Sequence, residues 1–397
     1  MTKNQDIKFF ENKLLEFITE EDPLLSMLRW VTEKLIEVEV SQKVGAGKGK
    51  HSPDRTTSRS GTRVRRFDTR LGTIYLVIPK IRKGGYIPFF VTEKKRSEQA
   101  LLEVIQESWK NGVSTRKIDR LAKSMGIENI SASQVSEINK GLDEQVIEFR
   151  NRRLEEEYPV IWIDALYEKI RNDRRVENMA VMVVKGVNMQ GIPSILAVEP
   201  MENESEATYR ALFSRLKERG LKKVWLCVSD AHAGLQAAIK KEFIGSSWQR
   251  CKVHLMRNIL AHVPQREKER FAGHLKQIWL EPERESAIAN AKRLIEKYEK
   301  RFPAAVACLE SGLEDSLQFY ALPEIDHRKI ASTNTLERLN LEIRRRSRVV
   351  GIFPNVNSYV RLITTYLVEY EEDWQSGRCY IKAESLERQK AILNNAA

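Results

Sequence analysis

The sequence predicts a mixed α/β fold, in which a mixed β-sheet with helices on both faces forms the main core. Two observations support this prediction. Short apolar runs rich in Val, Ile, Leu and Met, typical of buried strands, occur between residues 158 and 250. They follow the order β-β-β-α-β-α-β-α, with three successive strands before strands and helices alternate. The flanking segments have helical patterns, which places the sheet in the middle of the 397-residue chain.

Residues 1–43 are expected to form an N-terminal helical region. Apolar side chains recur every three or four residues between Leu24 and Ile36, and this spacing predicts helical structure over 7–43. With 42% hydrophobic residues, the chain has enough apolar material for a packed core, which excludes wholesale disorder.

The positive charge of the chain is concentrated in one segment. The net charge is +12, and residues 41–85 contain 12 basic and 2 acidic residues. Gly, Ser, Thr and Pro predict a loop to about Arg63, and alternating apolar residues predict a β-hairpin over 64–82. A soluble linker is one interpretation, but the scarcity of acids favours an arm that binds phosphates. We therefore assign 44–95 as DNA-contacting, through Lys48, Lys50, Arg55, Arg59, Arg63, Arg65 and Arg66.

Residues 96–150 have the pattern of a helix–turn–helix. One helix begins near Thr115, and Gly126 stands where a C-cap glycine belongs. Ser131 and Gln134 form a capping-box pattern at the start of the second helix. A helical pair can be a packing unit only, but the adjacent basic segment favours DNA binding. The expected shared core is Ile118, Leu121, Val135 and Ile138, and the expected DNA contacts are Arg116, Ser133, Gln134 and Lys140.

The strands of the sheet follow from Tyr158 onward. PVIWIDAL, ENMAVMVVKGVNM and GIPSILAVEP predict three strands, the last two forming an antiparallel pair across Gly191. A helix with Ser205 as N-cap then precedes the strand KKVWLCVSD, the helix AHAGLQAAIKKEF and the strand SSWQRCKVHL. This order matches the ribonuclease H-like layout. Residues 255–330 then have an almost wholly helical pattern.

Three acidic residues are the candidate catalytic set. Asp164 and Asp230 follow apolar strand residues, where an unpaired acid is costly, at the edge where open α/β sheets bind ligands. Asp230 alone could be a helix N-cap, and Glu337 alone could be an exposed residue of an Arg-rich helix. Together, three carboxylates can hold two Mg²⁺ ions that promote in-line displacement at a phosphodiester.

Cys251 and His254 form a C-x₂-H pair, which is half of a zinc site. No second close pair is obvious, so we assign His254 to the active site, near a scissile or flanking phosphate. A simply buried histidine is the alternative. Further candidate phosphate contacts are Lys252, Arg257, Arg344, Arg345 and Arg346.

The sequence resembles Mutator-type transposases of bacterial insertion sequences, which are DDE recombinases. The resemblance covers about 60–380 and is most specific in YPVIWIDALYEKIR, VSDAHAGLQAAI, WQRCKVHLMRN and STNTLERLNLEIRRRSRVVGIFPN. It implies that 255–330 is an all-α insertion in the catalytic core, whose first part spans 151–254 and whose C-terminal part spans 331–397. It further implies that Asp164, Asp230 and Glu337 bind two Mg²⁺ ions, for which Mn²⁺ can substitute. It also implies double-stranded DNA, both inverted repeats and target, as the partner, and a homodimer or higher homo-oligomer.

The expected function is therefore a DNA transposase that binds terminal inverted repeats and catalyses strand cleavage and strand transfer. The alternatives are a catalytically silent, transposase-derived DNA-binding regulator and an RNase H-fold nuclease that does not join strands. No apolar run approaches the ~18 residues of a membrane span, and the N-terminus lacks a signal-peptide pattern. We expect a cytoplasmic, nucleoid-associated protein with no membrane partner and no small-molecule cofactor.

Overall fold

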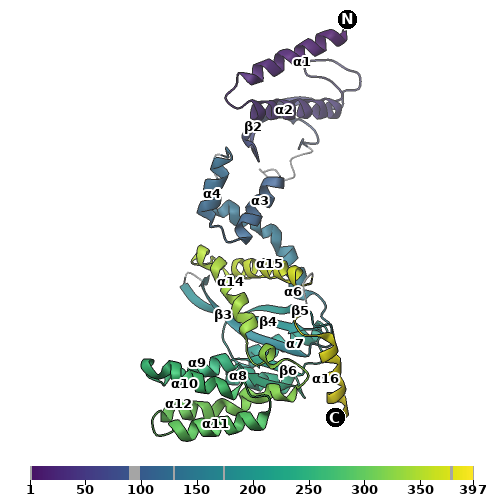
Figure 1. The fold of residues 1–397 in the computed structure, drawn as a ribbon. Coiled ribbons are helices and arrows are strands. Elements are labelled where there is room, and N and C mark those ends of the chain that lie inside the picture. Colours follow the sequence, from purple (N-terminus) through teal and green to yellow (C-terminus); the bar gives the residue numbers. More distant parts are fainter. Residues whose placement is uncertain (1, 89–98, 128–129, 173–174, 376–378, 397) are drawn as a thin grey trace. The chain divides into compact units, whose positions relative to one another are not determined.

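The structure is a computed structural model that describes residues 2–88, 99–127, 130–172, 175–375 and 379–396 (Figure 1). The chain divides into two compact units, Met1–Gly141 and Leu142–Ala397. The predicted boundary between the hairpin and the helix–turn–helix, at 95/96, lies outside the described residues. No described helix is long and apolar enough to cross a membrane.

The first unit contains five helices and a two-stranded sheet among its described residues. The elements are α1 (Thr2–Ile18), α2 (Pro23–Val44), β1 (Arg59–Thr69), β2 (Gly72–Ile81), α3 (Gln99–Lys110), α4 (Thr115–Ser124) and α5 (Ala132–Asn139). The helical region predicted over 7–43 is divided in two. Asp22 caps α2 by accepting a hydrogen bond from the Leu25 N–H, and Pro23 occupies the first turn, where its missing N–H is not needed.

The predicted hairpin is present, and it packs on α2. Strands β1 and β2 are antiparallel, and Ile36 of α2 packs with Ile74, Leu76 and Ile78 of β2 in a small core. The first strand begins at Arg59, so the predicted loop to Arg63 is too long. The strand begins early because the Arg59 guanidinium holds it against α2. The guanidinium donates hydrogen bonds to the side chains of Glu37 (2.6 Å) and Ser41 (2.9 Å) on α2 and to the Ala46 carbonyl (3.1 Å) just after α2.

Helices α4 and α5 occupy the positions predicted for the helical pair. The Ser131 side chain accepts from the Gln134 N–H, and the Gln134 side chain accepts from the Ser131 N–H, so the capping box is confirmed. Ile118 and Val135 are buried as predicted. Leu121 is 41% exposed, so its assignment to the shared core is wrong; its neighbour Ala122 faces the interior instead.

The second unit is a mixed α/β structure, as predicted. Its strands are β3 (Val160–Asn172), β4 (Arg175–Val187), β5 (Pro193–Met201), β6 (Leu226–Ser229) and β7 (Ser247–Arg250). The sheet order is β5-β4-β3-β6-β7. Strands β3, β4 and β5 are antiparallel neighbours, whereas β6 runs parallel to both β3 and β7.

Helices cover both faces of this sheet. Helices α7 (Glu206–Glu218) and α8 (Ala233–Glu242) contribute to a buried cluster that includes Ile161 and Ile163 of β3. Helices α14 (Asn334–Val350) and α15 (Val356–Gln375) also contact β3. Helix α6 (Asp143–Asn151), predicted within the helix–turn–helix region, packs in the second unit against α15. Arg361 of α15 donates two hydrogen bonds to Asp143, at 2.6 and 2.8 Å.

The helical insertion between β7 and α14 is present as a bundle (Figure 1). The bundle comprises α9 (Lys252–Ala261), α10 (Gln265–Ile278), α11 (Arg284–Tyr298), α12 (Pro303–Leu313), a 3₁₀ segment (Glu314–Ala321) and α13 (His327–Ile330). Outside the bundle, α16 (Ala383–Ala396) is the last helix of the chain. The buried Gln249 of β7 ties the sheet to the 3₁₀ segment. Its side chain donates to the Ser316 carbonyl (2.8 Å) and accepts from the Phe319 N–H (2.9 Å).

Candidate functional site

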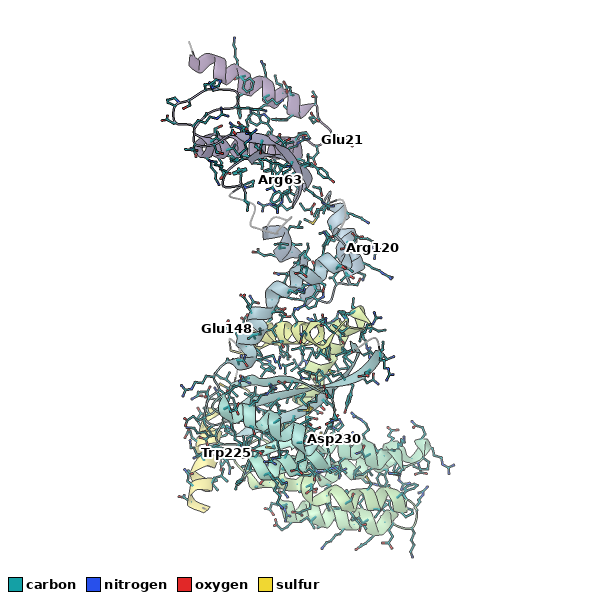
Figure 2. All side chains as sticks on the ribbon, turned by 180° about the vertical axis from the view of Figure 1, so that it is seen from behind. Glu21, Arg63, Arg120, Glu148, Trp225 and Asp230 are labelled. Atoms are coloured by element: carbon teal, nitrogen blue, oxygen red, sulfur yellow. The ribbon has the colours of Figure 1, made fainter. Side chains whose placement is uncertain are left out.

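The parallel pairing of β3 and β6 places two of the predicted acids at the same level of the sheet. Trp162 pairs with Val228, and Asp164 and Asp230 each lie two residues further along their chains. Figure 2 labels Trp225 just before β6 and Asp230 just after it, the latter on the side of the insertion helices. Asp230 directly follows β6, as predicted. Asp164 instead lies within β3, which continues to Asn172 because it stays paired with β4, so the prediction that Asp164 ends its strand is wrong. Both acids nevertheless line one pocket.

Helix α14 brings the third acid to this place. Glu337 lies in the first turn of α14, and Asn340, three residues later, lies on the same helix face. The Asn340 amide donates a hydrogen bond of 2.7 Å to Asp164 Oδ2, while Asp164 Oδ1 accepts from the Ala165 N–H at 3.0 Å. Asn340 thus anchors the helix that carries Glu337 to the strand that carries Asp164.

Asp164, Asp230 and Glu337 line one pocket of about 590 Å³. The sequence analysis missed several other residues of this pocket, among them Glu204, His232, Asn258 and Asn340. Glu204 accepts a hydrogen bond from Tyr209 (2.5 Å) and lies 3.8 Å from His232 Nε2. The sequence signal that could have identified Asn340 is its spacing of three residues from Glu337, which places both residues on one face of a helix. Glu204 precedes a helix cap and had no comparable signal.

The carboxylates of the pocket repel one another. Burial raises the pKa of Asp164 to about 6, and the negative charges of Glu337 and Asp230 add to this effect. His254 and the Ala165 N–H act in the opposite direction but do not cancel it. Burial and the neighbouring acids both disfavour the charged form of Asp164, and a bound cation would stabilise that form.

His254 provides part of the existing positive charge. It lies in the first turn of α9, and its Nε2 is 3.6 Å from Glu337 Oε1. Contact with Cys251 raises the pKa of His254 to about 9, against the effect of its burial, and attraction from Asp230 and Asp164 adds to the rise. These contacts favour the protonated form of the imidazole.

Cys251 joins two parts of the site. The thiol is fully buried and accepts hydrogen bonds from the N–H and the hydroxyl of Thr333, both at 3.3 Å. Burial alone would raise the pKa of Cys251, but the contacts with His254 and Thr333 lower it. Because Thr333 directly precedes α14, Cys251 links the helix of His254 to the helix of Glu337.

The donor chemistry of the pocket suits magnesium. Its acids offer hard carboxylate oxygens, which Mg²⁺ prefers, and a bound cation would stabilise the charged form of Asp164. Within the part of the chain that the structure describes, no three Asp, Glu, His or Cys side chains are arranged as a ready-made metal site. Side-chain rotation would thus have to bring the three carboxylates together around the ions.

Several basic residues predicted to bind DNA in the first unit already have partners. The Arg63 guanidinium donates to the Tyr86 carbonyl (3.2 Å), Arg66 pairs with Asp68 (2.9 Å), and Lys140 pairs with Glu137 (2.7 Å). Ser133 is exposed, but the Gln134 side chain is engaged in its capping box. Lys48, Lys50 and Arg55 lie between α2 and β1, Arg65 lies on β1, and Arg116 lies on α4.

The basic residues predicted in the second unit divide into two groups. Arg257 and Arg344 line the carboxylate pocket, and Arg257 lies 3.4 Å from Glu337. Arg346 is directed elsewhere, pairing with Glu342 (3.1 Å) and stacking over the Tyr366 ring at 3.9 Å. Arg345 is exposed on α14, and Lys252 lies at the start of α9.

Comparison with known proteins identifies the family. The model of the family "Transposase, Mutator family" matches residues 1–377. The chain is 38% identical to the transposase for insertion sequence element ISRM5 of Rhizobium meliloti, over 95% of both chains. It is 38% identical to the transposase for IS1081 of Mycobacterium tuberculosis, over 94% of this chain and 91% of that protein. It is 35% identical to the transposase for IS256 in transposon Tn4001 of Staphylococcus aureus, over 93% and 95%.

Among solved structures, the Drosophila P element transposase strand transfer complex matches 72% of this chain and 83% of that chain, with 12% identity. The TM-score of that match is 0.30. By its family model and its sequence relatives, the chain belongs to the Mutator family of transposases.

Proposed function

We propose that this transposase cleaves DNA at the ends of an insertion sequence and joins those ends to target DNA through the pocket of Asp164, Asp230 and Glu337. One observation carries the proposal: the three acids come from β3, the end of β6 and α14, yet they line the same pocket, together with Arg257 and Arg344. The sheet order supports a ribonuclease H-like core, in which the first strand is central and the acids lie beside it.

Asp164, Asp230 and Glu337 would hold two Mg²⁺ ions in this proposal. When bound, the ions would activate the attacking oxygen and stabilise charge on the leaving oxygen. Asn340 keeps the Asp164 carboxylate turned toward the pocket, because it binds one of its two oxygens. Arg257, and His254 when protonated, would supply positive charge beside Glu337, where a DNA phosphate would approach.

The chemistry has two balanced steps. In the first, a water oxygen forms a bond to the scissile phosphorus and the bond from phosphorus to the 3′ oxygen breaks, which leaves a 3′-OH on the element and a 5′-phosphate on the flank. In the second, this 3′ oxygen attacks a target phosphodiester, and a target 3′-OH leaves. Each step exchanges one phosphodiester oxygen for another, so no covalent enzyme intermediate is needed.

DNA recognition is assigned to the first unit. The basic loop between α2 and β1 would contact phosphates, and α4 and α5 would act as a helix–turn–helix on the terminal inverted repeats. We further propose that the protein acts as a dimer or higher assembly, because joining an element requires both of its ends to be held together.

The test is strand cleavage and strand transfer in vitro, using labelled inverted-repeat ends, target DNA and Mg²⁺. Asp164→Asn, Asp230→Asn and Glu337→Gln should each lose cleavage while retaining inverted-repeat binding. Cleavage by any of these variants at the wild-type rate would contradict the assignment of that residue. Hydrolysis without joined products would favour a nuclease, and binding without cleavage in any divalent metal would favour a regulator.

A further inference from the structure

A second concave surface adjoins the carboxylate pocket. It is a groove of about 760 Å³, formed mainly between α9 and α10 of the insertion, and its apolar lining consists of Val253, Met256, Leu260, Ala261, Trp279 and Leu280. Leu280 is 64% exposed at the edge of the groove. Trp279 is held in place, because its indole N–H donates to Ser316 Oγ at 3.0 Å. An open apolar groove of this size is typical of a surface that binds another molecule.

The rim of the groove is positively charged. Lys252, Arg257, Lys268 and Lys276 surround these apolar residues, and the groove has no acidic residue in its lining. Among the described residues, none of the three lysines forms a salt bridge. Arg257 pairs with Glu337, so the three lysines supply the unpaired positive charge of the groove. Positive charge beside an apolar lining is complementary to a ligand that has both a flat apolar part and a negative backbone.

The groove is continuous with the proposed active site. Arg257 lines both the groove and the carboxylate pocket, and its guanidinium lies 3.4 Å from Glu337. Lys252 and His254 lie in the same first turn of α9, one lining the groove and the other lining the pocket. A strand whose scissile phosphate lies at the carboxylates would therefore pass the mouth of the groove.

We propose that the groove receives an unpaired nucleobase of the DNA strand, next to the scissile phosphate, while the lysines and Arg257 bind the adjoining phosphates. The proposal rests on the proposed function, since it concerns the same DNA. The base must be unpaired, because a base inside a duplex is stacked and cannot reach a side groove. Stacking on apolar and aromatic side chains stabilises such a base with little dependence on its identity.

The test is a mismatch scan. DNA binding is measured with Asp164→Asn, because this variant should not cleave its substrate. Each inverted-repeat end carries one mismatched base pair, and the position of the mismatch is moved step by step across the scissile phosphate. A mismatch at the occupied position removes the cost of unpairing, so it should tighten binding by about tenfold. In the same background, Met256→Glu and Leu280→Glu should abolish this gain.

The matched control is Ile244→Glu, at an apolar residue that is 90% exposed and outside the groove. This variant should retain the gain in binding. The charge control is Lys292→Glu, at an exposed lysine of α11 outside the groove, which should also retain it, whereas Lys276→Glu should reduce it. The inference is overturned if no mismatched position tightens binding. It is equally overturned if a mismatch tightens the binding of the Asp164→Asn, Leu280→Glu double variant as much as that of Asp164→Asn alone. It is also overturned if Leu280→Glu instead dissociates the protein into monomers, because the groove would then hold a second copy.

The two proposals can fail separately. Suppose that the wild type cleaves and joins fully paired ends but the scan shows no mismatch effect. The proposed function would then stand, and only the role of the groove would be contradicted. Absence of cleavage and joining on every substrate would instead contradict the proposed function.

Discussion

Asn340 offers the sharpest single perturbation of the site. Its amide donates to Asp164 Oδ2 at 2.7 Å, whereas its own Oδ1 is buried without a hydrogen-bond partner. Asn340→Leu therefore removes the donor from Asp164 and also removes an unsatisfied oxygen. The two effects on stability oppose each other, so we expect the fold to persist while the position of the Asp164 carboxylate is lost.

The size of the effect follows from the charge of the acceptor. A hydrogen bond to a charged group contributes about 1.5–3 kcal/mol, and each 1.4 kcal/mol corresponds to about a tenfold change in rate. If the bond holds Asp164 in its reactive orientation, Asn340→Leu should slow cleavage by roughly 10–150-fold. Binding to the inverted repeat should change little, because Asn340 makes this contact inside the protein.

The assay is single-turnover cleavage of a labelled inverted-repeat end in saturating Mg²⁺, with urea unfolding measured on the same preparations. Val349→Ala, on the same helix but outside the pocket, is the matched control and should cleave at the wild-type rate. A wild-type cleavage rate for Asn340→Leu would refute the positioning role. A loss of rate accompanied by an equal loss of DNA binding would also refute it.

Three further predictions concern residues outside the acidic set. Burial lowers the pKa of Lys185 to about 7 from 10.5, so the unfolded state binds more protons above pH 7 and stability should rise with pH up to about 10.5. Lys185→Met should abolish this rise in urea titrations. Gly191 has a φ of 78°, and a Cβ added there would lie 1.7 Å from the Ile381 carbonyl oxygen. Gly245 has a φ of 86° but open space around it, so Gly245→Ala should lower the free energy of unfolding by only about 1–2 kcal/mol. Gly191→Ala should lower it by clearly more. Cys251→Ala removes the acceptor for both Thr333 donors and should slow cleavage several-fold with DNA binding retained, whereas equal rates would show that Cys251 only fills space.

The local features of the fold could be predicted because neighbouring residues determine them. The apolar runs of the strands, the capping box of Ser131 and Gln134, and the antiparallel pair across Gly191 all appear in the structure. Features that depend on contacts between distant segments could not be predicted. Arg59 begins its strand early because it binds Glu37, which the local loop composition does not reveal.

The candidate site shows the same division. Asp164 and Asp230 were identified because each acid follows a run of apolar strand residues, and the parallel register brings them level. Asn340 was missed because its role depends on a contact with Asp164, 176 residues away. The groove between α9 and α10 has no counterpart in the sequence pattern, since it arises only when two amphipathic helices pack and leave Leu280 exposed.

The central claim is that metal ions held by Asp164, Asp230 and Glu337 act directly on the scissile phosphodiester. Its most direct test replaces the 3′ oxygen that leaves in the first step with sulfur and compares cleavage in Mg²⁺ and Mn²⁺. Sulfur is a poor ligand for Mg²⁺ and a better one for the softer Mn²⁺. The account predicts that the sulfur substrate is cleaved slowly in Mg²⁺ and that Mn²⁺ restores the rate, whereas the oxygen substrate shows no such preference. An identical ratio of sulfur to oxygen rates in the two metals would contradict it.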